Sequence, residues 1–193
     1  MRDNVCIAAR DIDGDGKVEV AVGTNWNPGE TSDVEKSGGV WFVGSLGKIQ
    51  PKRLPHDPTT HRMHWVKMED GYSIVAAPLH GRGNKGGAGE NGTRLHAYHA
   101  GNNPYKSNWE RSVVSDQLHK THNFEPIQGA NSSSESVVIA GGEGLILARQ
   151  VDGEWKSRAS ESLSNGAGEI RIGALSPNGT PQSVATIEPM HGN

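Results

Sequence analysis

The chain has 193 residues, a formal net charge of −3, 26 glycines and one cysteine. This length can bury a sizeable core in one domain, and the glycine content favours turn-rich β structure over helices. Lysine and arginine are scattered singly, so no basic stripe is present to neutralise a phosphate backbone, and we expect no nucleic-acid partner. A single cysteine excludes an internal disulfide framework.

The sequence also gives no sign of a membrane segment. No apolar run approaches the ~20 residues of a membrane span, and residues 1–11 lack the apolar core of a signal peptide. Cys6 lies in an apolar run, which is typical of a small buried side chain rather than a reactive thiol. An extracellular or periplasmic location is favoured but not assigned, because an export signal can be removed. The oligomeric state is left open.

Short apolar strands recur along the chain, each preceded by a polar turn. Their ranges are 18–23, 72–78, 136–142 and 182–189. A second strand follows most of them, at 38–46, 93–101 and 143–158, and the last of these contains a hairpin turn with the sequence DGEW. The only candidate helix is 103–120, and its central sequence NWERSVV fits an outer strand better.

A degenerate repeat of this kind, with four short antiparallel strands in each unit, predicts an all-β fold, namely a β-propeller of about four blades. The expected blade-like units are 1–50, 51–110, 111–165 and 166–193. Four-bladed rings are uncommon, so we expect the chain to be part of a larger propeller of about seven blades. A β-sandwich with irregular loops is the alternative.

The first polar turn, DIDGDGKVE, has the composition of a metal-binding loop. Carboxylates at alternate positions direct oxygen atoms at one hard cation such as Ca²⁺. The candidate ligands are the side chains of Asp11, Asp13, Asp15 and Glu19 and the backbone carbonyl of Lys17. An EF-hand is excluded because position 12 of the loop is Val22, on a strand. An ordinary type I turn is the other alternative, although three such close carboxylates would repel one another.

With its following strand, this loop resembles the calcium loop of FG-GAP or VCBS repeats, which have the pattern DxDGDGxxE. That family consists of β-propellers, so the resemblance implies one structural Ca²⁺ in the first blade. The turns before the other strands lack the matching acids.

Several polar phrases recur at related positions of the repeat. Loops between the blades of a propeller converge on its axial channel, so these groups are expected to share one funnel. The candidate catalytic residues in these phrases are His61, Arg82, His122, Arg171, Glu188 and His191. Histidine can act as a general base or a metal ligand, and arginine can stabilise an enolate charge. For each histidine alone, a structural role is the alternative.

The phrases HRMHW, PLHGRGNKG, THNFEP, GEIRIG and ATIEPMHGN together resemble the propeller domain of aldos-2-ulose dehydratase and its VCBS-repeat relatives. This resemblance implies dehydration of a keto-sugar by β-elimination, with a divalent metal and a carbohydrate substrate. Rhamnose-glucuronate lyases on related propellers offer a similar chemistry on oligosaccharides. The chain lacks the cupin pattern of the dehydratases.

β-Elimination needs a base for the proton α to the carbonyl, a cation for the enolate oxygen and an acid for the departing hydroxyl. We assign the base to His122 or His61, the positive charge to Arg82 and Arg171, and the acid or a metal ligand to His191 with Glu188. The expected cofactors are the structural Ca²⁺ and a second divalent cation, Mg²⁺ or Zn²⁺. The alternatives are a calcium-stabilised propeller that binds glycans or proteins without catalysis, and a chain that is inactive on its own.

Overall fold

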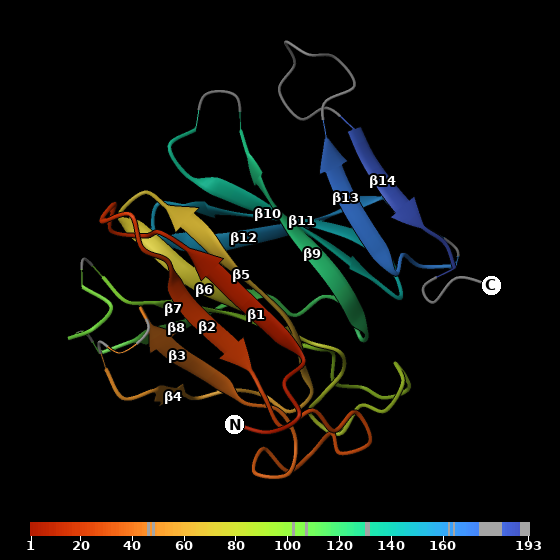
Figure 1. Cartoon of the computed structure of the whole chain (residues 1–193). Coiled ribbons are helices and arrows are strands. Elements are labelled where there is room, and N and C mark those ends of the chain that lie inside the picture. Colours follow the sequence, from red (N-terminus) through yellow and green to blue (C-terminus); the bar gives the residue numbers. More distant parts are fainter. Residues whose placement is uncertain are drawn as a thin grey trace.

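In a computed structural model, the chain consists of antiparallel sheets connected in series (Figure 1). The structure describes residues 1–45, 47, 49–101, 103–106, 108–129, 132–161, 163, 165–173 and 183–189. Within these residues there is no helix, and so none long and apolar enough to cross a membrane. The predicted all-β class is therefore confirmed for the described part of the chain.

Three of the sheets have four strands and the last has two. In each sheet every strand pairs with the next one along the chain. The first sheet contains β1 (Cys6–Arg10), β2 (Glu19–Gly23), β3 (Val40–Gly44) and β4 (Lys52–Leu54). The second contains β5 (Thr60–Met68), β6 (Gly71–Pro78), β7 (Leu95–His99) and β8 (Glu110–Ser115). The third contains β9 (Thr121–Gln128), β10 (Glu135–Gly141), β11 (Gly144–Val151) and β12 (Glu154–Glu161), and the last contains β13 (Glu169–Gly173) and β14 (Ser183–Ile187).

The predicted strands and the predicted hairpin are present. The hairpin joins β11 to β12 through Asp152 and Gly153, whose φ angles of 52° and 79° are those of the left-handed turn that twists with the strands. The candidate helix at 103–120 is instead the strand β8 with its flanking loops, as its central sequence indicated. Two strands do not follow the predicted unit limits. β4 belongs to the first sheet but lies after residue 50, and β8 belongs to the second sheet but extends beyond residue 110.

The first strand of each sheet lies against the first strand of the next, so that β1, β5, β9 and β13 gather in the middle of the molecule and run in the same direction (Figure 1). The start of β1 lies beside the start of β5, where a Cβ on Gly23 would meet both Cys6 and Thr60. Near the other end, Arg10 donates a hydrogen bond to the carbonyl of Trp65 at 3.3 Å. We call these four strands the inner strands.

The sheets pack face to face through apolar side chains, and three clusters fill the three spaces between consecutive sheets. Phe42 and Trp65 meet edge to face between the first and second sheets. Phe124 and Val75 lie in the second cluster, and Ile170 lies in the third. In the second and third strands of each four-stranded sheet, which we call the middle strands, successive side chains point to opposite faces. A sheet that is covered on both sides requires apolar residues at both sets of positions.

The connection between β4 and β5 is fixed by a buried carboxylate. Asp57 accepts hydrogen bonds from Arg94 at 3.0 and 3.2 Å, and its Oδ2 lies 3.2 Å from Nε2 of His96. Burial opposes ionisation of Asp57, but the hydrogen bonds and positive charges of His96 and Arg94 outweigh it and lower the pKa of Asp57 to about 2.

We expect Asp57→Asn to lower the free energy of unfolding by about 2 kcal/mol at pH 7. Because the pKa of Asp57 is depressed in the folded state, its stabilisation is present above the unfolded pKa near 3.8 and is lost as the pH falls toward about 2. Urea denaturation of both proteins between pH 7 and pH 2 measures this. A difference between variant and parent that stays constant over this range contradicts the assignment.

Candidate functional site

A β-bulge at the start of β5 sets the position of His61. Thr60 pairs with Pro78 of β6, but the next pair along the two strands is Arg62 with Ala77. His61 is therefore an extra residue without a counterpart on β6. A bulge of this kind bends the strand and redirects the side chain of the extra residue.

The same irregularity occurs at the start of β9. Thr121 pairs with Gly141 of β10, and the next pair is Asn123 with Ala140, so that His122 is the extra residue. His61 and His122 thus occupy equivalent positions in two consecutive sheets.

The two bulges bring the histidines together between the sheets. The ring centroids of His61 and His122 are 5.0 Å apart, and the ring centroid of Trp26 lies 4.9 Å from that of His61. Nδ1 of His122 is 2.8 Å from the carbonyl oxygen of Gly168. A carbonyl can only accept, so Nδ1 carries the proton, and in the neutral ring Nε2 holds the lone pair.

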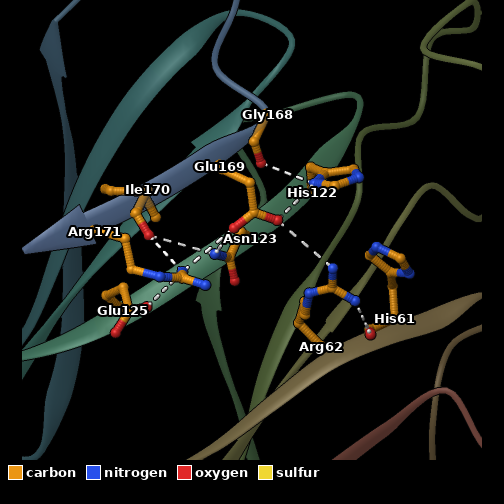
Figure 2. A network of polar contacts seen from close by, with 9 residues as sticks. All are labelled: His61, Arg62, His122, Asn123, Glu125, Gly168, Glu169, Ile170 and Arg171. Carbon is orange, nitrogen blue, oxygen red and sulfur yellow. Dashed lines mark hydrogen bonds and ion pairs between the residues drawn. The ribbon is translucent and has the colours of Figure 1, made fainter. Parts of the chain in front are cut away.

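Glu169, the first residue of β13, connects the inner strands through its carboxylate. Oε2 accepts a hydrogen bond from Asn123 at 2.7 Å and lies 3.3 Å from the guanidinium of Arg171. Oε1 lies 3.6 Å from Nδ1 of His122 and 3.7 Å from Arg62 (Figure 2). One half-buried carboxylate is thus shared by two guanidinium groups, an amide and an imidazole.

Arg171 extends these contacts along β13. It donates to Glu125 of β9 at 2.8 Å and to the carbonyl of Ile170 at 2.7 Å. We call the following set the inner-strand polar network: His61, Arg62, His122, Asn123, Glu125, Glu169 and Arg171 (Figure 2). Five of these side chains, those of Arg62, Asn123, Glu125, Glu169 and Arg171, line a hollow of about 330 Å³ between β1, β5, β9 and β13.

His64 lines the same hollow, two residues beyond Arg62. Its ring contacts Phe124 edge to face at 4.9 Å between centroids. Burial lowers the pKa of His64, and the nearby charges of Arg171 and Arg62 act in the same direction against that of Glu125. The neutral imidazole is therefore the favoured form at this position.

The predicted site residues are brought together only in part. His61, His122 and Arg171 belong to the network. Arg82 lies in the β6–β7 loop, where its Nε donates to the carbonyl of Gly92 at 2.7 Å, and no hydrogen bond or ion pair of the described residues joins it to the network. Glu188 follows β14 and accepts a hydrogen bond from Thr186 at 2.9 Å. His191 lies outside the described residues.

These groups were predicted to lie in loops between blades, and this was wrong for the network. His61, His122 and Arg171 lie on the inner strands β5, β9 and β13. The error arose because their phrases contain charged residues and a proline in place of the expected alternation. A sequence signal was nevertheless present. Arg62 and Asn123, which the prediction omitted, each directly follow the dipeptide Thr-His.

The acidic loop lies at the other end of the inner strands, directly after β1. The carboxylates of Asp11, Asp13 and Asp15 have oxygen atoms within 4.8 Å of one another. Asp11 also accepts hydrogen bonds from the backbone of Gly14 at 2.7 Å and Gly16 at 3.0 Å, and both glycines have positive φ angles. The loop is therefore wound around the Asp11 side chain.

Glu19 lies outside this group of carboxylates. It is fully buried, and its Oε1 accepts hydrogen bonds from Ser45 and Tyr105, both at 2.6 Å. Its Oε2 accepts one from the backbone of Ile12 at 3.2 Å. Lys17 is exposed, and its backbone nitrogen donates to Asp15 at 2.9 Å. In this structure Glu19 anchors the loop to the core.

The three aspartates fit a hard cation in their chemistry, since each supplies carboxylate oxygen and no soft ligand is near. Within the described residues, this is the one group of three or more acidic, histidine or cysteine side chains whose ligand atoms converge so closely. The second predicted divalent cation therefore has no comparable group there.

Comparison with known proteins finds no family model that matches the chain and no significant match among curated proteins. The resemblance to the VCBS-repeat dehydratases thus rests on the phrases quoted above and stays a prediction.

We expect Glu169→Gln to lower the free energy of unfolding by about 1 kcal/mol, because a neutral amide cannot balance the charges of Arg62 and Arg171. Urea denaturation provides the measurement. Glu154→Gln is the matched control, since Glu154 pairs with Lys156 on the exposed surface, where an ion pair contributes little. Equal losses in the two variants would count against a central role for Glu169.

Proposed function

We propose that the chain is part of a β-propeller of about seven blades whose axis follows the inner strands, and that it acts as a carbon–oxygen lyase on a keto-sugar. The observation that carries this proposal is the pair of matched bulges, which places His61 and His122 side by side next to a charged network. Bulges are over-represented beside active sites, where they redirect a side chain.

The two histidines supply the acid and base that β-elimination requires. His122 is the better base, since its Nδ1 proton is held by the carbonyl of Gly168 and the lone pair is on Nε2. It removes the proton α to the ketone, and the electron pair moves onto the carbonyl oxygen. A protonated His61 then donates to the hydroxyl at the β carbon, which leaves as water and yields the unsaturated ketone.

Arg62 and Arg171 provide positive charge for the developing enolate. Both are held by Glu169, at 3.7 and 3.3 Å, so their guanidinium groups are oriented before a substrate arrives. We therefore assign to Arg62 the charge-stabilising role that the sequence indicated for Arg82. Arg82 remains a candidate for binding the distant part of the substrate, and with His61 as the acid, Glu188 and His191 keep their predicted role as metal ligands.

We propose Ca²⁺ as the ligand of the acidic loop, with Asp11, Asp13 and Asp15 as its carboxylate ligands. The convergence of their oxygen atoms supports this assignment. The ion would neutralise the repulsion among the three carboxylates and fix the β1–β2 connection. It lies at the end of the strands away from the histidines, so its role would be structural.

Sugar binding without catalysis is the second candidate function. It is favoured by the half-buried Trp26, whose ring lies at 4.9 Å from that of His61, tilted by 32°, and offers an aromatic surface beside the network. Saturable binding of a keto-sugar or a uronic-acid oligosaccharide with no unsaturated product would support this candidate over the lyase.

We expect His122→Ala to reduce kcat/KM for elimination by about 10² to 10⁴, the usual contribution of a general base. The assay follows the absorbance of the unsaturated product with keto-sugars and with uronic-acid oligosaccharides. His119→Ala is the matched control, because His119 lies three residues before His122 but pairs with the exposed Glu143. Undiminished elimination by a folded His122→Ala protein would remove His122 from the mechanism.

We expect Ca²⁺ at about a hundred times its dissociation constant to raise the free energy of unfolding by about 3 kcal/mol. Asp13→Asn should abolish most of this gain, whereas Asp152→Asn, in another exposed turn, should keep it. Thermal denaturation with Ca²⁺ and with a chelator measures both variants. A gain that is equal in the two variants contradicts the assignment of the loop.

A further inference from the structure

One face of the first sheet is apolar and lies uncovered. The opposite face packs on the second sheet through Phe42 and Ala21. The side chains of the uncovered face, which we call the open face of the first sheet, alternate with these along the strands. They are Ile7, Ala9, Val20, Val22, Trp41 and Val43, all at least partly exposed.

The equivalent positions in the other sheets are buried. Ile7 of β1 pairs with Val22 of β2. The equivalent residue is Met63 in the second sheet, where it pairs with Ala76, and Phe124 in the third, where it pairs with Ile139. Met63 and Phe124 are 2% and 0% exposed, because each packs on the sheet that precedes its own. Ile7 is 66% exposed. The repeat itself therefore indicates that another sheet belongs against Ile7.

The last sheet also has one uncovered apolar face, on the side away from the third sheet. Ile187 of β14 pairs with Glu169, as Ala140 pairs with Asn123 in the third sheet. Ala140 is 0% exposed because the last sheet covers it, whereas Ile187 is 55% exposed. Ala185, also exposed, lies on the same side of β14. We call this the open face of the last sheet.

We propose that a second copy of this chain covers the open face of the first sheet with the open face of its own last sheet. The chain carries both halves of the junction, and inside it four consecutive sheets are already joined through three junctions of this same order. The two faces are unlike, so the contact is head-to-tail, and two copies close into one ring through two identical junctions. This inference rests on the propeller arrangement proposed above, and it sets the number of sheets in the ring at eight, four from each copy.

The molecular mass in solution tests this inference. Light scattering coupled to size-exclusion chromatography should give twice the mass of one chain. Ile7→Asp and Ile187→Asp should each give a single-chain mass, since every junction then has one charged face. Both side chains are exposed, and circular dichroism verifies that the variants fold. Val113→Asp is the control, because Val113 is an exposed apolar residue on β8, away from both open faces.

Mixing the two variants distinguishes a head-to-tail junction from a symmetric one. A pair made of one Ile7→Asp chain and one Ile187→Asp chain has one junction with both faces intact, so the mixture should regain the double mass. The inference is overturned by a folded parent chain of single mass, by variants that keep the double mass, by a mixture that stays monomeric, or by open chains of increasing length. A monomer that eliminates water overturns only this inference, whereas a dimer without elimination overturns only the lyase proposal.

Discussion

The fold depends on one constraint, namely that each middle strand is apolar on both of its faces. Ile74 of β6 packs toward the first sheet and Val75 toward the third, and the same alternation is present in β10 at Val137 and Val138. Such a sheet loses stability when one of its faces is in water, because burial of apolar area is the main favourable term in folding. It has to be placed between two others, which arranges consecutive sheets in a stack that turns about the inner strands.

This stacking forces the inner strands close together and so creates the place where polar groups must be paired. At one end, Nη1 of Arg10 donates to both carboxylate oxygens of Glu135, at 3.0 and 2.9 Å, and the backbone nitrogen of Lys67 donates to Glu135 at 2.7 Å. One carboxylate of the third sheet thereby joins the first and second. Farther along, Glu169 does the same for β5, β9 and β13. In both places a carboxylate that is partly or largely withdrawn from solvent is paired with several donors.

The order of the strands was predictable from the sequence because the apolar middle strands at 72–78 and 136–142 have a strong local signal that depends on burial alone. The inner strands β5 and β9 were not predicted. Their polar residues, such as Arg62 and Asn123, are satisfied only by partners from other sheets, and no local pattern encodes a contact over that distance. The bulges at His61 and His122 also interrupt the alternation by which strands are identified.

The acidic loop and the bulged histidines therefore have different physical roles. The acidic loop follows the end of β1, and the bulged histidines stand at the start of β5 and β9, so that the length of the inner strands separates them. Charge at the acidic loop can fix a turn but lies far from the network around His122. Glu19 illustrates the division: the sequence indicated a metal ligand, whereas its carboxylate is held by Ser45 and Tyr105 in the core. The elimination that we propose belongs to the opposite end of the strands, where the bulges bring the imidazoles of His61 and His122 together.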